Sequence, residues 1–380
     1  MPRLAELVAA MDEWYDPSWA ESWDAVGLVC GDPDESVQRV LLAVDPVAAT
    51  VDEAIEAGAQ LLITHHPLLL TPVHGVPVSD PRGALVHRMI RNGVAHLVAH
   101  TNADVADPGV SDALAACLGL TDLEPLQPQL DPALVKLVVF VPGADADRLT
   151  DALAAAGAGA IGDYDRCRWT STGQGSFRPL AGSSPTIGVQ GEVSVVDETR
   201  LEMVVPPARV ADVVAALRAS HPYEEPAFDV LAQVALPGTR GIGRVGTLPR
   251  SMTLGEFTEY AAGRLPATRW GVRAAGDPDA SVQRVAVCGG AGGSYAPLAM
   301  RAGADVLLTS DLKHHVTLDA CASIALIDAA HWATESPWLD QVAARLRNRF
   351  GTTVEVHVSR RITDPWTLHA PSPESSPTQQ

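Results

Sequence analysis

Basic side chains are scarce in this chain of 380 residues. Lysine and arginine total 27 against 46 aspartates and glutamates, which gives a formal net charge of −19. Only Lys136 and Lys313 are lysines. An electrostatic field of this sign repels phosphate backbones, so the composition argues against general nucleic-acid binding. We therefore expect partners among small molecules, metal ions and further copies of the chain.

Long apolar runs and closely spaced cysteines are also missing. No stretch approaches the roughly 18 uninterrupted apolar residues of a membrane span, and the amino-terminal segment MPRLAELVAAMDEWYD lacks the pattern of a signal peptide. The five cysteines are odd in number and widely separated, which favours reduced core thiols over disulfides or a thiolate metal site. These absences predict a cytoplasmic protein.

Four short clusters of histidine and carboxylate residues each follow an apolar run typical of a buried strand. They are His65 and His66 in LLITHHP, His100 and Asp104 in HTNAD, Asp311 and His315 in SDLKHH, and His331 and Glu335 in HWATE. Open α/β folds build their sites where parallel strands end, so the four clusters could share one sheet edge. A lone histidine in an apolar chain is usually a core residue, but six of the twelve histidines lie in these clusters. Together they indicate a metal site.

The spacing and chemistry of these residues suit two divalent ions. The pairs His100/Asp104 and His331/Glu335 are four residues apart, which places both side chains on one face of a helix. A glutamate can also bridge two ions through its two oxygens. Imidazole and carboxylate without thiolate suit Zn²⁺, Mn²⁺, Fe²⁺ or Ni²⁺ without choosing among them. Two such ions would generate hydroxide at neutral pH and polarise a phosphoryl group or a ring carbon.

An internal duplication supports the same interpretation. The pentapeptide SVQRV at residues 36–40 recurs at residues 281–285, and EAGAQLLIT at 56–64 is echoed by RAGADVLLT at 301–309. A third echo relates AHLVAHTNAD to LIDAAHWATE, so that His-x-x-x-Asp corresponds to His-x-x-x-Glu. Repeats this similar predict two related half-domains that face each other, with an insertion between them.

The pattern of elements predicts an α/β fold. Residues 1–126 alternate strand-like and helix-like segments and form the first half-domain, and residues 239–367 form the second, so that the two pseudo-repeated halves make one metal-binding domain. The segment LEPLQPQLDP, rich in proline, is expected to be a linker. Residues 130–235 predict an inserted ferredoxin-like α+β domain with a split βαβ pattern. The tail at residues 368–380 is rich in proline and serine, which predicts disorder.

Two further features have more than one interpretation. Lys313 is one of only two lysines and lies beside His315, so a specific ammonium role near the site and a chance position are both open. The glycine-rich segment GGAGGS at residues 289–294 follows a strand and precedes a helix-like segment. Its backbone amides could cradle an anion such as phosphate, and a plain tight turn explains the glycines equally well.

The motifs taken together resemble a known family. ESWDAVGLVCGD, the HHP of LLITHHP, HTNADVADPGVSDALA, GADVLLTSDLKHH and IDAAHWATE are similar to the Nif-three-like dinuclear metal centre proteins, also described as GTP cyclohydrolase I type 2 homologs. The match extends over both half-domains. The middle segment with HPYEEPAFDV is similar to the insertion of the longer members, which resembles trimeric PII-like domains.

The resemblance implies a ligand set and an assembly. It implies that His65, His66, Asp104, His331 and Glu335 bind two divalent ions with Glu335 as the bridge, and that His100 is a further ligand or a neighbour of one. It also implies a ring-shaped homohexamer whose metal sites face an interior cavity.

Two functions fit these expectations. The first is a metal-dependent hydrolase that acts on a nucleotide-like or phosphorylated small molecule, with GTP ring opening as the model; Asp311, Lys313 or His315 would then shuttle protons or hold the anionic part of the substrate. The second is a non-enzymatic metal-binding scaffold, chaperone or regulatory hexamer. An open coordination position on each ion would favour the enzyme.

Overall fold

The computed structural model describes residues 1–131 and 133–370. Contacts divide the chain into two compact units. Unit 1 combines Met1–Gln129 with the chain from Thr239 onward, and unit 2 is Leu130–Gly238. The predicted tail lies almost wholly outside the described residues. Among the described residues, none of the helices combines the length and apolarity that crossing a bilayer requires.

The first sheet of unit 1 has five strands. Its order is β1 (Gly27–Cys30), β4 (Ala95–Val98), β3 (Leu61–Thr64), β2 (Arg39–Ala43) and β15 (Glu355–Val358). Strands β15, β2, β3 and β4 are parallel, and β1 is antiparallel to β4. Alternate residues of β3 face opposite layers, since successive side chains of a strand point to opposite sides. Leu61 and Ile63 join the core beneath α1 (Leu4–Trp14) and α12 (Pro337–Phe350), whereas Leu62 packs toward α2 (Ala48–Glu56) and α3 (Pro81–Arg91).

The second sheet repeats this order. Its strands are β11 (Val272–Ala275), β14 (Ala325–Ala329), β13 (Val306–Ser310), β12 (Ser281–Val287), β10 (Pro237–Thr253) and β5 (Thr121–Leu130). Strands β12, β13 and β14 are parallel, as β2, β3 and β4 are in the first sheet. One face packs on α5 (Val110–Cys117) and α8 (Leu254–Arg264), and the other on α9 (Ala296–Arg301) and α10 (His314–Ala320). The order β1-β4-β3-β2 is thus repeated as β11-β14-β13-β12.

The two halves of unit 1 exchange their last elements. Helix α5 follows β4 in the chain but packs on the second sheet, and β5 pairs at the edge of that sheet. Helix α12 follows β14 but packs on the first sheet, where β15 pairs with β2. Each sheet is therefore completed by the other half of the sequence, and the two halves share one folded body.

The expected linker LEPLQPQLDP is corrected by this exchange. Most of it belongs to β5, which forms the outer edge of the six-stranded sheet. Pro125 and Pro128 are tolerated there because an edge strand can leave a backbone position without an N–H donor on its free side. The last residue of the segment, Pro132, lies outside the described residues.

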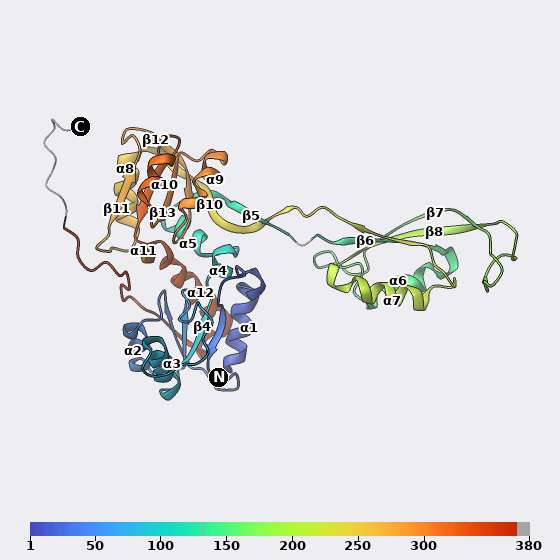
Figure 1. The fold of residues 1–380 in the computed structure, drawn as a ribbon, viewed down its shortest axis with the longest axis horizontal. Helices are drawn as coiled ribbons and strands as arrows, with labels where there is room; N and C mark the ends of the chain where they lie inside the picture. The colour runs from blue at the N-terminus through green and yellow to red at the C-terminus, as the bar shows by residue number, and fades with distance from the viewer. Residues whose placement is uncertain (132, 371–380) are drawn as a thin grey trace. The chain divides into compact units, whose positions relative to one another are not determined.

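Unit 2 is an antiparallel sheet covered on one side by two helices. Its elements are β6 (Val135–Pro142), α6 (Ala146–Ala155), β7 (Arg168–Phe177), β8 (Ser194–Val205), α7 (Val210–Ser220) and β9 (Phe228–Ala232). The sheet order is β7-β8-β6-β9, the arrangement of a split βαβ, ferredoxin-like fold. Helices α6 and α7 lie on the same face (Figure 1) and bury Leu137, Leu201 and Met203 beneath them.

Candidate metal centre

The histidine clusters meet where strands from both sheets of unit 1 end. His65 and His66 directly follow β3, and His100 precedes the short helix α4 (Thr101–Val105) after β4. In the second sheet Asp311 follows β13, and α11 (His331–Glu335) begins just after β14. Figure 1 shows α4 and α11 between the two sheets. The exchange of α5 and α12 brings the carboxyl edges of the two sheets together around these residues.

Glu335 lies at the centre of the cluster. Its Oε1 is 2.9 Å from Nε2 of His331 and 3.5 Å from Nε2 of His65. Its Oε2 is 3.1 Å from Nε2 of His66. Asp104 approaches from the other side, with Oδ1 3.7 Å from Nε2 of His65. The Glu335 side chain is only 4% exposed, so one buried carboxylate faces three imidazoles.

Each of the four histidines is oriented through Nδ1 by a group that can only accept a hydrogen bond. Nδ1–H of His65 donates to the carbonyl of Ala99 at 3.0 Å. The other three acceptors are Asp45 for His66 at 2.7 Å, Asp24 for His100 at 2.8 Å, and Asp311 for His331 at 2.5 Å. These partners fix the tautomer, because an imidazole that donates from Nδ1 presents a lone pair at Nε2. Metal-binding histidines are held in this way.

The donor set fits a pair of divalent cations. Among the described residues, His65, His66 and His100 form one triad of ligand atoms within 4.8 Å of one another, and His66, His331 and Glu335 form a second. Nε2 of His65 is buried and has no hydrogen-bond partner in the described part of the chain. A buried polar atom of this kind costs about 1–3 kcal/mol unless something satisfies it. The atom lies where a cation would be bound.

The charges of the cluster shift its pKa values strongly. Burial lowers the pKa of His66, but Glu335 and the hydrogen bond to Asp45 outweigh burial and raise it to about 11. At His331 burial also lowers the pKa, but Glu335 and the hydrogen bond to Asp311 outweigh burial and raise it to about 10. Burial raises the pKa of Glu335, yet the three histidines hold it well below its usual range. Protons thus compete with cations for the same nitrogen atoms.

The glycine-rich segment at residues 289–294 is a closed turn against this cluster. The amide of Gly290 donates to Thr334 Oγ1 at 2.9 Å, and that of Gly292 donates to Thr309 Oγ1 at 2.7 Å. These amides are therefore used within the protein, which favours the turn over an anion cradle. Gly290 has φ +65°, and a Cβ there would lie 2.5 Å from Oε1 of Glu335. Glycine keeps this wall of the cluster open.

The three residues expected to act as proton shuttles lie in different surroundings. Asp311 faces the cluster, where its hydrogen bond to His331 lowers its pKa despite burial. It holds a histidine in place and adopts a positive φ of 56° at the turn after β13. Lys313 and His315 are exposed at the start of α10. The structure brings neither of them to the histidine cluster.

Two aspartates that orient histidines of the cluster were not among the predicted site residues. Asp45 follows β2 in the segment LLAVD, the same position after a strand that marks the other clusters. Asp24 lies in ESWDAVGLVCGD, and its carboxylate accepts from His100 and from the backbone and hydroxyl of Thr101. Burial raises the pKa of Asp24, but these hydrogen bonds outweigh it and lower the pKa. Asp24 thus anchors His100 and the start of α4.

A cavity of about 230 Å³ opens beside His66 and His331. Its walls include Trp270, Trp332 and the C-terminal segment at residues 363–366. The rings of Trp270 and Trp366 are 5.4 Å apart at an angle of 36°. Thr363 donates a hydrogen bond to Asp45, which joins this segment to the carboxylate that orients His66. The cluster is therefore reached past two indole rings.

Comparison with known proteins identifies the family. The family model described as Duf34/NIF3 (NGG1p interacting factor 3) matches residues 2–365. The chain belongs to this family. A Mycobacterium leprae protein named GTP cyclohydrolase 1 type 2 homolog is 50% identical, over 97% of this chain and 96% of its own length. A Bacillus subtilis protein of the same name is 38% identical over 96% of this chain and 98% of its own.

Solved structures show the same fold. The crystal structure of a Staphylococcus aureus protein superposes with a TM-score of 0.84 at 30% identity, and covers 97% of this chain and 99% of its own. A Bacillus cereus protein related to NIF3 gives a TM-score of 0.74 at 36% identity over the same shares. The mixed α/β fold class expected from the sequence is confirmed.

Proposed function

We propose that the cluster holds two divalent metal ions and that the protein is a metal-dependent hydrolase of a nucleotide-like or phosphorylated small molecule. The observation that carries this proposal is a set of four histidines whose Nδ1 atoms are all anchored. The Nε2 atoms of three of them face Glu335, and His100 lies in one group of possible ligands with His65 and His66. His65, His100 and Asp104 would hold one ion, His66 and His331 the other, and Glu335 would bridge them. The names of the relatives, GTP cyclohydrolase 1 type 2 homologs, point to the same chemistry.

Bound divalent ions would act as Lewis acids that make water acidic and polarise a phosphoryl or carbonyl group. The protein's own residues position the ligand atoms for these ions. Asp45, Asp24 and Asp311 hold three imidazoles in one tautomer and orientation, so the ligand atoms need little rearrangement on binding. The buried His65 and Glu335 exclude bulk water from the inner side of the cluster.

The cavity beside the cluster favours an enzyme over a structural metal site. Trp270 and Trp366 contribute aromatic surface to its wall. The ring of Trp270 is contacted by Trp366 and by the guanidinium of Arg273, so the exposed indole of Trp366 is the surface on which a flat heteroaromatic ring could stack. A substrate with a planar ring bound there would lie next to His66 and His331. A structural site is usually closed by protein ligands and needs no adjoining cavity.

A metal-dependent scaffold or regulatory protein is the second candidate. A separate cavity of about 650 Å³ lies wholly within unit 2, away in sequence from every residue of the histidine cluster. A ligand bound there would make unit 2 a sensor, whatever the cluster does.

Elemental analysis of protein purified without added metal tests the binding part of the proposal. We expect about two divalent ions per chain, a loss in His66→Ala, and no loss in His74→Ala, because His74 is exposed and lies outside the cluster. A wild-type protein that binds no divalent ion, even after dialysis against Zn²⁺ or Mn²⁺, would refute it.

A turnover screen of nucleotides and phosphorylated metabolites tests the catalytic part. The expected hydrolase activity requires added metal and disappears in His66→Ala but not in His74→Ala. Metal-loaded protein that turns over none of the compounds would favour the scaffold.

A further inference from the structure

The segment HPYEEPAFDV in unit 2 forms a wall of the larger cavity, which the proposed metal chemistry does not use. His221, the first residue of this segment, is buried. Its Nε2–H donates to the carbonyl of Phe140 at 3.0 Å, and its Nδ1 accepts from the amide of Tyr223 at 3.0 Å. Both ring nitrogens are therefore used, and burial lowers the pKa of His221. A neutral imidazole thus fixes the turn that presents Tyr223 and Glu224 to the cavity.

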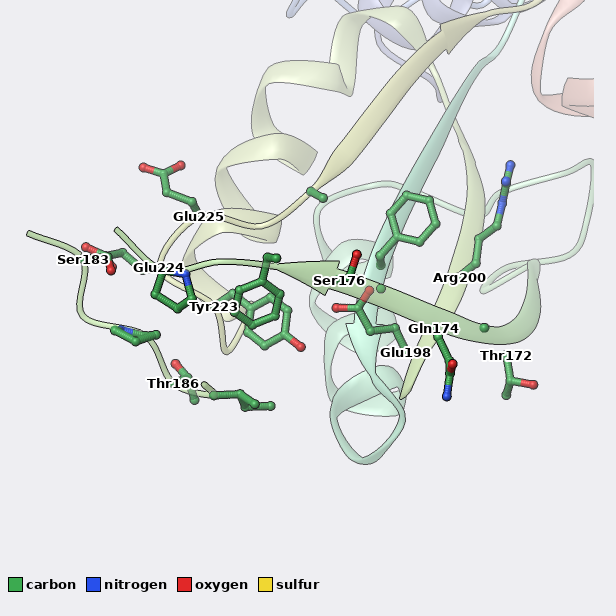
Figure 2. Close-up of a pocket in the computed structure, with 18 of the residues that line it drawn as sticks. Thr172, Gln174, Ser176, Ser183, Thr186, Glu198, Arg200, Tyr223, Glu224 and Glu225 are labelled. Atoms are coloured by element: carbon green, nitrogen blue, oxygen red, sulfur yellow. The ribbon is translucent and has the colours of Figure 1, made fainter. Parts of the chain in front are cut away.

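A long loop between β7 and β8 extends the wall that this segment forms. The amide of Ser184 donates to Glu224 at 2.9 Å, and the hydroxyl of Thr186 donates to the carbonyl of Pro222 at 2.7 Å. These bonds attach the loop between β7 and β8 to the HPYEEPAFDV segment. Figure 2 shows Ser183 beside Glu224, and Thr186 near Tyr223. The cavity is open on one side, and its volume of about 650 Å³ is within the range of small-molecule sites.

The walls combine aromatic rings with carboxylates. Phe140, Phe177 and Tyr223 line the cavity, and the rings of Phe177 and Tyr223 are 6.0 Å apart. The ring of Phe140 already carries a cation, because the guanidinium of Arg200 lies 5.9 Å from its centroid. The acidic lining residues are Glu198, Glu224 and Glu225, against Arg200 as the one basic residue of the lining. Rings and carboxylates of this kind together attract organic cations.

Glu198 is the carboxylate that lacks a counterion. The nearby basic residues Lys136 and Arg200 both pair with Glu202, at 2.9 Å each. Glu198 is left without an ion pair among the described residues of unit 2. Its carboxylate lies against Gly175 of β7, where a Cβ would be 2.2 Å from Oε2. The absence of a side chain at Gly175 is what makes room for Glu198 beside the cavity.

Tyr223 adds a polar group at the same place. Its hydroxyl is buried beside the Glu198 carboxylate. Burial, together with the interaction of the phenol with the Glu198 carboxylate as hydrogen-bond acceptor and as charge, raises its pKa to about 12, so the phenol stays protonated at neutral pH. Figure 2 shows Tyr223 and Glu198 on neighbouring walls. An ammonium group placed there would meet the Glu198 carboxylate and the aromatic faces at once.

We propose that this cavity of unit 2 is a binding site for a small organic cation with an apolar body, such as a protonated amine, with Glu198 as its counterion. The charge of the lining excludes phosphorylated or carboxylate ligands as preferred occupants. The site is distinct from the histidine cluster and is a candidate for an effector rather than a substrate.

Three probes of matched size test the proposal on the full chain: 2-phenylethylammonium, neutral 2-phenylethanol and the anion 3-phenylpropionate. Binding is measured by titration calorimetry and by ligand-observed NMR. We expect the cation to bind at least tenfold more tightly than the alcohol and the anion not to bind. Equal affinity for cation and alcohol, or no binding of the cation, would overturn the proposal.

Variants locate the site. Glu198→Gln removes the charge while keeping the shape, and should weaken binding of the cation at least tenfold. Glu192→Gln is the matched control, because Glu192 is exposed on the loop just before β8 and does not line the cavity. Gly175→Ala should weaken binding as well, since the added methyl group displaces the Glu198 carboxylate. Unchanged affinity in both Glu198→Gln and Gly175→Ala would refute the assignment. It would also be refuted if a second copy of the chain fills the cavity, so that the cation cannot enter.

Discussion

At the scale of single residues, hydrogen bonds to the surrounding groups determine which atoms of the centre remain available to a metal ion. The four histidine Nδ1 atoms are each committed to one acceptor, and the hydroxyls of Thr309 and Thr334 hold the glycine turn. What remains is a set of Nε2 and carboxylate oxygen atoms that face one another. Glu335 contacts three of the imidazoles, whereas Asp104 contacts one. This asymmetry distinguishes the two carboxylates experimentally.

Glu335→Ala should lose both metal ions, because each ion drops a ligand and the two dications lose the carboxylate that screens their repulsion. Asp104→Ala should remove a ligand from one ion only and leave about one metal per chain. The measurement is mass spectrometry of the intact folded chain after loading with Zn²⁺ or Mn²⁺. Both variants should keep their circular dichroism spectrum, since the cores rather than the metals supply most of the stability in a domain of this size. Equal metal content in the two variants would contradict the bridging role of Glu335.

The residue patterns predicted the candidate metal ligands better than the carboxylates that orient them. His65, His66, His100, Asp104, His331 and Glu335 were all marked by one signal, a ligand-type side chain just after an apolar strand. Asp45 carries the same signal but has no histidine beside it in the chain. Its role appears only when β2 and β3 pair and bring it to His66. Lys313 was singled out because lysine is rare in this chain. Rarity does not indicate where a side chain points, and Lys313 is exposed.

At the scale of elements, the duplication predicted two related halves but neither the order of their strands nor the exchange. The SVQRV repeats open the segments that become β2 and β12, and both halves do build the order found for β1, β4, β3 and β2. Sequence similarity cannot say which sheet α5 or α12 will cover, because each has an apolar face that suits either core. Long-range packing decides it: Leu114 joins the second core and Leu339 the first.

Arg244 of β10 is buried and stabilises this exchange by joining β10 to α5. Its side chain is 2% exposed and donates to Asp112 at the start of α5 and to the carbonyls of Ala106, Gly241 and Gly243. Arg244→Ala should lower the free energy of unfolding of unit 1 by about 3 kcal/mol, since it removes the ion-pair partner of the mostly buried Asp112 carboxylate and the donor to three backbone carbonyls. Urea denaturation measures this. Arg250→Ala, on an exposed position of the same strand, should change it by less than about 0.5 kcal/mol.

His96 of β4 makes the first sheet sensitive to acid. It is fully buried, its Nε2 is 2.8 Å from Thr64 Oγ1 on β3, and burial lowers its pKa to about 4 from 6.5. Between these values the unfolded chain binds a proton that the folded chain does not, so stability falls as pH decreases from 6.5 to 4. The loss should reach about 3 kcal/mol at pH 4.

The comparison that isolates this effect is the metal-free wild type against His96→Gln, with urea denaturation at pH 7 and at pH 4. The variant should lack that part of the acid loss, so the difference between the two proteins should change by about 3 kcal/mol over this range. A difference that is the same at both pH values would show that His96 takes up its proton without cost to the fold.

At the scale of the whole molecule, unit 2 interrupts a body that is otherwise complete. The strands on either side of it, β5 and β10, both belong to the six-stranded sheet, so the insertion enters and leaves through neighbouring strands. Unit 2 also carries exposed apolar side chains along and after β9: Val230, Leu231, Val234 and Leu236. An apolar strand at a sheet edge is a surface that a second chain can cover. We propose on this basis that unit 2 mediates self-association in the homohexamer that the family resemblance implies.

Replacing Leu130 to Val234 with a short linker should therefore lower the order of the oligomer while leaving the metal content of unit 1 intact. The metal content should persist because every proposed ligand and every group that orients one lies outside the deleted segment. Light scattering coupled to size exclusion gives the mass of the assembly, and elemental analysis of the same fractions gives the metal content. A milder variant, Leu231→Glu, places a charge on the apolar edge strand β9 without removing the fold of unit 2 and should shift the mass in the same direction. Hexamers of unchanged mass in both variants would mean that unit 1 assembles without help from unit 2, and that the apolar strand faces some other partner.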